Sequence, residues 1–414
     1  MKPTGPIPPD FVGQRTLTIG GRDAEDWAAA GTPAFVYDSA IVAARVAQLR
    51  AALPDGVDVH YAIKANPFTS FLQNVSELVD GLDVASAGEL ALALAVKPAH
   101  AISFAGPGKR DAELEAAITA GATLNLESEG EGERALAIGA RLGIAPRVAV
   151  RVNPAFELKG SGMKMGGRAS PFGVDAVRVP ALVHRLIDGG ADWRGFHIFA
   201  GSQSLDTQAI IDTQAAAVAL AMELAENVGA VPPLVNLGGG FGIPYFAGDT
   251  PVDVAAIGAA LSERLTGAWR AERYAIELGR WLVGEAGVYL TRVIDRKESG
   301  GETFLVVDGG LHHQLAATGN FGTVVRRTYP IALARDVGGE LTETVSIVGP
   351  LCTPLDRLAD RIGFPHAEPG DLIAVFLAGA YGATASPSAF LGHPPARELV
   401  TSPPDRQRAR LNIG

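Results

Sequence analysis

The chain has 414 residues, of which 47% are hydrophobic and 19% are charged, and it contains 50 glycines and 27 prolines. This length favours about two domains, and the composition is typical of a globular protein. A formal net charge of −10 without a basic run argues against a nucleic-acid partner, which would need clustered Lys and Arg. The single cysteine, Cys352, excludes an intramolecular disulfide and is typical of a reducing compartment.

The N-terminal residues 1–14, MKPTGPIPPDFVGQ, contain no apolar core of a signal peptide. No stretch reaches the ~18–20 uncharged apolar residues that a membrane helix needs. We therefore expect a cytoplasmic protein that does not bind a membrane.

Strands and helices are predicted to alternate from residue 33 to about residue 280. Residues 33–38 (PAFVYD) are predicted to form a strand, followed by a helix that Ser39 caps. Eight further strand-sized apolar runs follow, most of them separated by stretches of helical length: 59–65, 81–86, 102–106, 123–128, 147–154, 195–203, 234–240 and 273–280. Eight strands that are mostly followed by helices predict an α/β fold with a parallel (β/α)8 TIM-like barrel.

The pattern changes after residue 285, where strand-like runs are separated by turn residues and helical periodicity is weak. This pattern of short strand-like runs predicts a C-terminal β-domain, and the strand at 33–38 could join its sheet. We therefore expect an N-terminal segment at 1–38 that contributes to the β-domain, a barrel at 39–284 and the β-domain at 285–414.

Lys64 occupies an unusual place for a lysine. It follows the alternating strand 57–63 and precedes Asn66-Pro67, which ends the strand because proline cannot continue a ladder. An unpaired ammonium is costly to bury, so such a lysine either reaches the surface or is used chemically. If desolvation lowers its pKa, the amine becomes a nucleophile.

Other polar and glycine-rich elements follow the strands at corresponding positions, where barrel enzymes carry their functional residues. They include Asp83, His197, the run Gly238–Gly240, and Glu277 with Arg280. Each of them alone has an ordinary structural explanation. Together they suit an anionic, planar cofactor, because glycine amides can cradle a phosphate and Glu277 can bond a protonated ring nitrogen. With His197 stacked on the ring and Lys64 bound to an aldehyde, the cofactor that fits is pyridoxal 5'-phosphate.

The order of the motifs resembles that of the fold-type III pyridoxal-phosphate decarboxylases, which include the diaminopimelate, ornithine and arginine decarboxylases. The resemblance rests on YAIKANP, DVASAGEL, HIFAGSQ, NLGGGFGIPY, ELGR, VVDGG, GPLCTPLD and AGAYG, in that order. It extends from about residue 33 to residue 400. The motifs HIFAGSQ, GPLCTPLD and AGAYGATASPSAFLGHP are most similar to those of a bacterial subgroup associated with exosortase systems. They are also similar to those of decarboxylases that act on carrier-protein-linked amino acids.

The resemblance implies a role for each matching residue. It implies catalytic roles for Lys64, His197 and Cys352. It implies that the cofactor binds to Lys64, Asp83, His197, Ser202, Gly238, Gly239, Gly240, Glu277, Gly279, Arg280 and Tyr381. It implies that the substrate contacts Arg280, Asp308, Asp356 and Tyr381.

The reaction that the resemblance implies is the decarboxylation of an amino acid. The substrate amine takes the place of Lys64 on the cofactor, carbon dioxide leaves Cα, and Cys352 returns a proton to Cα. In this family the cysteine loop comes from the other subunit, which implies a homodimer with active sites at the interface.

Two departures from the family pattern concern the substrate. The residue after Cys352 is usually acidic, but here it is Thr353, and the segment after VVDGG lacks the arginine-proline pair of diaminopimelate decarboxylases. A substrate tethered to an acyl carrier protein would need no charged side chain to bind its distal end. Docking of an acidic carrier would then call for a basic patch, for which the candidates are Arg110, Arg168, Arg326 and Arg327.

Three alternatives remain open from the sequence. His312 and His313 invite a metal site, but adjacent strand residues point to opposite faces, so no metal is expected. An amino-acid racemase shares the barrel and the lysine but would lack the cysteine loop and the HIFAGSQ histidine. A non-catalytic cofactor-binding protein would be expected to have lost Lys64, Glu277 or Cys352, and this chain keeps all three.

Overall fold

The computed structural model describes residues 1–160, 162–164, 169–266, 271–319 and 327–402. The chain forms two compact units. We call Arg45–Ile243 with Pro251–Gly279 the barrel unit, and Met1–Ala44, Pro244–Thr250 and Arg280–Gly414 the β unit. Each is described by itself.

The barrel unit contains a closed parallel barrel. Its strands, within the described residues, are β4 (Val57–Ala62), β5 (Gly81–Val84), β6 (Ile102–Phe104), β7 (Thr123–Leu126), β8 (Arg147–Asn153), β11 (Asp192–Ile198), β13 (Leu234–Gly239) and β14 (Arg273–Leu278). They are hydrogen-bonded in chain order, and β14 closes the ring by pairing in parallel with β4. The predicted (β/α)8 barrel is thus confirmed.

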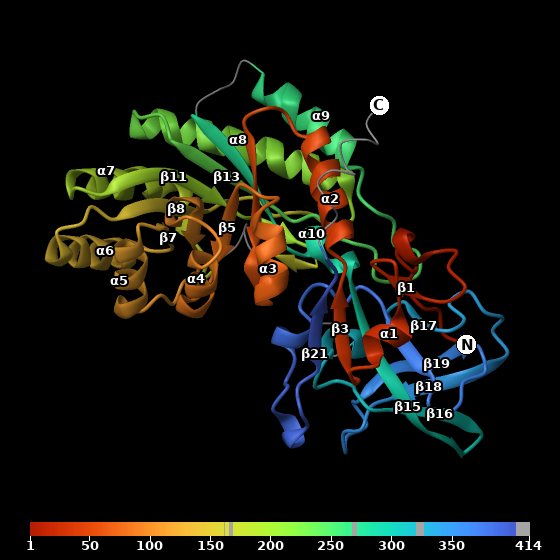
Figure 1. Ribbon diagram of the computed structural model, residues 1–414. Coiled ribbons are helices and arrows are strands. Elements are labelled where there is room, and N and C mark those ends of the chain that lie inside the picture. Colours follow the sequence, from red (N-terminus) through yellow and green to blue (C-terminus); the bar gives the residue numbers. More distant parts are fainter. Residues whose placement is uncertain (161, 165–168, 267–270, 320–326, 403–414) are drawn as a thin grey trace. The chain divides into compact units, whose positions relative to one another are not determined.

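Helices cover the outside of the barrel, as Figure 1 shows for α4 to α7. The helices are α2 (Ser39–Ala52), α3 (Thr69–Ser76), α4 (Ala87–Leu94), α5 (Asp111–Ala120), α6 (Glu129–Leu142), α7 (Val179–Asp188), α8 (Thr207–Val228) and α9 (Val254–Leu265). Ser86 and Asp206 cap α4 and α8 by accepting hydrogen bonds from backbone N–H groups three residues further on. At the start of α2 the capping acceptor is Asp38, whose carboxylate binds the Ala40 N–H at 2.9 Å, and not Ser39 as predicted.

The two faces of the barrel strands differ in character. In β4, Val59 and Tyr61 are fully buried, and they alternate with Asp58 and His60, which line an interior cavity of about 300 Å³. Polar residues of the other strands, Ser103, Thr123, Asn125 and Asn236, line the same cavity. Barrel interiors are usually filled by Val, Ile and Leu, so this barrel has an unusually polar centre.

The β unit is built on a sheet with the order β17-β20-β15-β16-β18-β19, to which β3 and β21 are added. The strands are β3 (Ala34–Tyr37), β15 (Gly287–Ser299), β16 (Glu302–Val307), β17 (Ile331–Leu333), β18 (Glu343–Val348), β19 (Arg357–Phe364), β20 (Leu372–Val375) and β21 (Arg397–Val400). β3 pairs antiparallel with β15 and parallel with β21. This sheet confirms the predicted β-domain.

Shorter elements complete the two units. They are β1 (Thr18–Ile19), β2 (Arg22–Asp23), α1 (Ala24–Ala28), β9 (Met163–Lys164), β10 (Val174–Asp175), β12 (Gly201–Ser202) and α10 (Arg280–Val283). Among the described residues, none of the helices has the length and apolar character needed to cross a membrane.

Candidate active site

Lys64 lies just beyond the C-terminal end of β4, in a 3-10 turn at Ile63–Ala65. The strand ends at Ala62, two residues before the lysine, because the Asn66 N–H closes the turn on the Ile63 carbonyl at 3.0 Å. The Lys64 side chain is exposed, and its ammonium lies 5.8 Å from the ring centre of Phe199. The burial that the sequence argument assumed for Lys64 is therefore absent, and an aromatic ring is its neighbour instead.

Glu277 and His197 form a buried pair inside the barrel unit. His197 Nε2 lies 2.9 Å from Glu277 Oε2, and both side chains are almost fully shielded from solvent. Burial alone would raise the pKa of Glu277. The hydrogen bond and charge of His197, together with the charges of Lys64 and Arg151, outweigh burial and lower that pKa to about 2. Glu277 is therefore a fixed negative charge at neutral pH.

The glycine run 238–240, at the C-terminal end of β13, packs so closely that side chains are excluded. A Cβ on Gly239 would lie 2.1 Å from the Glu277 carbonyl oxygen, and one on Gly238 would lie 2.7 Å from the Ile198 carbonyl oxygen. Gly238 and Gly240 also have positive φ angles, of 69° and 85°, which glycine adopts without strain. The Asn236 side chain accepts the Gly238 N–H at 2.8 Å and so fixes the start of the turn.

Ser202 and Gly279 lie beside these elements. A Cβ on Gly240 would lie 2.7 Å from the carbonyl oxygen of Gly201, the residue before Ser202. A Cβ on Gly279 would lie 3.1 Å from the Ala65 side chain, which follows Lys64. The barrel unit thus brings together the predicted residues at the C-terminal ends of β4, β11, β13 and β14.

Asp83 has a partner that the sequence argument missed. Its Oδ2 lies 3.4 Å from His60 Nδ1, and its Oδ1 accepts a hydrogen bond from the Ser103 hydroxyl. Burial would lower the pKa of His60, but Asp83 raises it, with smaller contributions from Asp58 and Glu277. The sequence feature that could have indicated this pair is His60, a histidine at an inward-facing position of the strand 57–63.

Arg151 is a second missed residue. Its guanidinium lies 2.8 Å from Glu127 Oε1, and both side chains are buried. Glu127 also accepts the N–H groups of Gly106 and Gly173, at 2.6 and 2.9 Å. Because the charge of Arg151 also lowers the pKa of Glu277, it contributes to the electrostatics of the site.

Arg280 and Tyr381 belong to the β unit, where they lie close together. The Arg280 guanidinium lies 4.7 Å from the ring centre of Tyr381 and 5.4 Å from that of Tyr245, and it donates a hydrogen bond of 2.8 Å to the Tyr245 hydroxyl. Tyr381 has a positive φ of 54°, a strained backbone angle for a bulky residue. Tyr245 was not predicted as a site residue; its motif, GIPY, was noted only as part of the resemblance.

Cys352 is exposed on the β unit, in the connection from β18 to β19. Asp308 and Asp356, the two carboxylates expected to contact substrate, are held by internal hydrogen bonds. Asp308 accepts the hydroxyls of Thr32 and Thr291 at 2.5 and 2.7 Å and a backbone N–H at 2.8 Å. Asp356 accepts two backbone N–H groups, one on each oxygen.

His312 and His313 do not point to opposite faces as predicted. They lie in a turn, and their ring centres are 3.7 Å apart. Burial is the main cause that lowers the pKa of His312 to about 4, aided by the charges of His313 and His393. No group of three metal-ligating side chains was found in the part of the chain that the structure describes.

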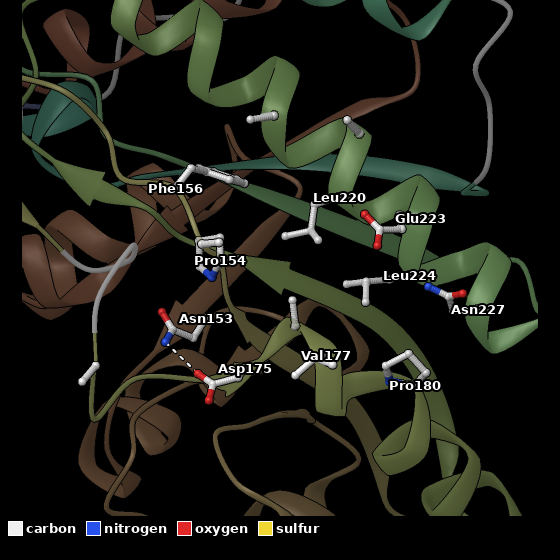
Figure 2. Close-up of a pocket in the computed structure, with 15 residues that line it drawn as sticks. Asn153, Pro154, Phe156, Asp175, Val177, Pro180, Leu220, Glu223, Leu224 and Asn227 are labelled. Atoms are coloured by element: carbon white, nitrogen blue, oxygen red, sulfur yellow. Dashed lines mark hydrogen bonds between the residues drawn. The ribbon is translucent and has the colours of Figure 1, made fainter.

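A groove of about 1190 Å³ lies elsewhere on the barrel unit. Figure 2 shows Leu220, Glu223, Leu224 and Asn227 of α8 on one side of it and Val177 and Pro180 on the other. Asn153 and Asp175, joined by a hydrogen bond of 3.0 Å, also line it. None of the residues expected to bind the cofactor is among its lining residues. The groove is therefore separate from the expected cofactor-binding residues.

The barrel and its strand-end residues define a pyridoxal-phosphate enzyme of the barrel class. The glycine run 238–240 excludes side chains, and a glycine backbone of this kind lets a phosphate approach closely. Glu277 stays ionised and can hold a proton on a ring nitrogen, and Lys64 is accessible to an aldehyde. The residues therefore fit the cofactor that the sequence indicated.

Comparison with known proteins identifies the family. Residues 39–284 match the model of the pyridoxal-binding domain of pyridoxal-dependent decarboxylases. The chain belongs to this family, and it is a pyridoxal-phosphate-dependent decarboxylase, as the sequence predicted.

Two relatives illustrate the range of the family. The chain is 37% identical, over 89% of its length and 88% of the relative, to an L-glutamyl-[BtrI acyl-carrier protein] decarboxylase of Niallia circulans. It is 32% identical, over 90% of its length and 88% of the relative, to a diaminopimelate decarboxylase of Archaeoglobus fulgidus.

Among solved structures, a diaminopimelate decarboxylase of M. jannaschii in complex with L-lysine is similar. The TM-score between the two structures is 0.84, and the two sequences are 26% identical. The match covers 96% of this chain and 93% of the M. jannaschii chain.

Proposed function

We propose that the protein decarboxylates an acidic amino acid that an acyl carrier protein holds through its side-chain carboxyl group. Decarboxylation at Cα requires a free α-amine and a free α-carboxylate. The tether must therefore use the distal end of the substrate, which becomes an uncharged thioester. Glutamate and aspartate are the common amino acids with a carboxyl group at that end.

The barrel residues would bind and orient the cofactor. Bound pyridoxal phosphate supplies an aldehyde for amines and an electron sink for the pair of electrons left when carbon dioxide departs. Glu277, with its pKa near 2, keeps a proton on the ring nitrogen, and His197 fixes the Glu277 carboxylate. The glycine run 238–240 would hold the phosphate, with its turn fixed by the Gly238 N–H bond to the Asn236 side chain, and the Lys64 amine would bind the aldehyde.

The β unit would supply the acid and further anion contacts. Cys352 donates the proton that Cα receives, and the guanidinium of Arg280, held by Tyr245 at 2.8 Å, binds an anion. The exposure of Cys352 is compatible with a loop that serves the site of a second copy. We therefore propose a homodimer with shared sites, and we keep the cytoplasm as the predicted location.

The observation that favours a tethered substrate is the lack of free charge around the Cys352 loop. Asp308 and Asp356 are engaged by internal hydrogen bonds. The position after Cys352 is the neutral Thr353, and His312 is uncharged at neutral pH because its pKa is about 4. Within residues 349–356 the one carboxylate, Asp356, is already engaged, and the loop contains no Lys or Arg that could bind a distal carboxylate.

The expected basic patch has little support within the described residues. The Arg110 side chain is 81% exposed but lies 3.2 Å from Glu113, and the Arg327 guanidinium lies 3.8 Å from the Phe246 ring centre. Arg168 and Arg326 lie outside the described residues. Carrier recognition is therefore proposed to rest on the tethered group more than on surface charge.

The test compares free and tethered substrates. The cofactor-loaded protein is given free glutamate, aspartate, lysine, ornithine and meso-diaminopimelate, and separately a carrier protein loaded with glutamate or aspartate through the side-chain carboxyl. Carbon dioxide release and the mass of the carrier are followed. We expect release from at least one loaded carrier and none from the free amino acids above the rate of a Lys64→Ala control.

The outcomes separate the alternatives. Rapid release from a free amino acid would contradict the tethered substrate and leave the decarboxylase assignment intact. Exchange of the Cα proton without carbon dioxide release would favour a racemase. A bound cofactor without either reaction on any substrate would favour a non-catalytic protein.

A further inference from the structure

The loop that carries Cys352 is built around one buried carboxylate. The loop connects β18, which ends at Val348, to β19, which begins at Arg357. Cys352 is exposed, whereas Asp356, four residues later, is only 3% exposed. The reactive side chain and the buried one thus belong to the same short turn.

Asp356 binds both its own loop and a second segment. Its Oδ2 accepts the N–H of Leu351, the residue before Cys352, at 2.9 Å. Its Oδ1 accepts the N–H of Leu311, in the segment after β16, at 2.6 Å. Its backbone adds two bonds within the loop, since its carbonyl accepts the Gly349 N–H at 3.1 Å and its N–H donates to the Thr353 carbonyl at 3.2 Å. One residue therefore fixes the loop on both sides of Cys352.

Two glycines make room for this carboxylate. A Cβ on Gly310 would lie 2.2 Å from Asp356 Oδ1, and one on Gly349 would lie 2.3 Å from Asp356 Oδ2. Neither glycine has a positive φ angle, so backbone conformation does not require glycine at these positions. The space taken by the carboxylate is what excludes a side chain there.

We propose that Asp356 is a positioning residue for Cys352 and not a substrate contact. It holds the Cys352 loop against the segment after β16, so that the thiol is presented in one place. Both oxygens are engaged by backbone N–H groups and the side chain is only 3% exposed, so burial denies a substrate ammonium access to the carboxylate. The inference rests on the proposed role of Cys352 as proton donor.

The decisive variant is Asp356→Asn, which keeps the shape of the side chain. An amide has one acceptor oxygen, so either the Leu311 or the Leu351 N–H must face an NH2 group and lose its bond. The loop should then open more readily. Because Cys352 is the single cysteine of the chain, a thiol reagent such as iodoacetamide reports on it alone.

We expect the alkylation rate of Cys352 in the cofactor-loaded Asp356→Asn protein to rise about five- to tenfold at fixed pH. With substrate, kcat should fall about tenfold while KM and the absorbance of the bound cofactor stay unchanged. A variant that combines Asp356→Asn with Cys352→Ala should be no slower than Cys352→Ala alone, because the carboxylate acts through the thiol. Asp295→Asn, on the exposed part of β15, is the matched control and should leave both rates unchanged.

Three results would overturn the proposal. They are an alkylation rate within twofold of the unmodified protein, a rise in KM at constant kcat, and losses that multiply in the double variant. The alkylation assay needs no substrate, so it still decides the proposal if no substrate is found and the proposed function fails. If Asp356→Asn does not fold, Gly349→Ala displaces the same carboxylate without deleting it and should raise the alkylation rate in the same way.

Discussion

The barrel unit and the β unit differ in the partners of several of their buried carboxylates. In the barrel unit charged groups face one another, as in Glu277 with His197 at 2.9 Å and Arg151 with Glu127 at 2.8 Å. In the β unit the carboxylates of Asp308 and Asp356 bind hydroxyl and backbone groups instead. The barrel thus keeps fixed charges in place, whereas the β unit uses its carboxylates to hold loops.

This difference matches two different tasks. A cofactor with a protonated ring and a phosphate needs opposing charges that are already in position, because reorganisation during the reaction is costly. A substrate with an uncharged distal end needs a shaped surface and a well-placed acid. The following changes test the difference, beginning with the largest expected effect.

Replacing Glu277 by glutamine should remove the fixed charge of the barrel unit. The amide cannot hold a proton on the ring nitrogen, so we expect kcat to fall about a hundredfold or more. The measurement is steady-state kinetics with the substrate that the carrier panel identifies. A loss below threefold, with normal cofactor content, would contradict the role of Glu277.

Replacing Gly239 by alanine should disturb the cradle without changing any charge. The new Cβ would meet the Glu277 carbonyl oxygen at 2.1 Å, which forces the backbone to shift and should destabilise the protein by about 1–3 kcal/mol. Urea unfolding measures the loss, and a cofactor titration should show weaker binding. Gly338→Ala, where nothing lies within 4 Å of the added Cβ, should change neither quantity.

Acid should destabilise the β unit through His312. Its pKa is about 4 in the folded protein, below the ordinary histidine value of 6.5, so the unfolded chain binds the proton more readily. The free energy of unfolding therefore decreases as the pH falls from 6.5 towards 4. At pH 5 the decrease is about 2 kcal/mol. His312→Asn should remove this part of the pH dependence when urea unfolding is compared at pH 7 and pH 5.

The control for that comparison is His100→Asn, because the His100 side chain is exposed. It should leave the difference between the two pH values unchanged. An equal pH dependence in His312→Asn and the unmodified protein would show that His312 does not carry the effect.

Strand order and the strand-end residues could be predicted because they depend on local patterns. Alternation around Lys64 and the apolar run before Gly238–Gly240 each mark the end of a strand, and parallel strands bring such ends together. The pairs Asp83–His60 and Glu127–Arg151 were missed because alternation shows that a side chain points inward but not which neighbour it meets.

Loop geometry in the β unit was harder to predict for a related reason. His312 and His313 were treated as strand residues, but Leu311 is held by Asp356 at 2.6 Å, and the resulting turn places the two rings side by side. The partner lies 45 residues away in the chain, beyond any local pattern.

The most direct test of the central claim is to locate the covalent attachment of the cofactor. The cofactor-loaded protein is reduced with borohydride and digested, and the pyridoxyl group is found by mass spectrometry. We predict that it lies on Lys64, and that Glu277→Gln leaves the attachment site unchanged. A pyridoxyl group on another lysine, or an active protein without one, would contradict the assignment of the barrel site.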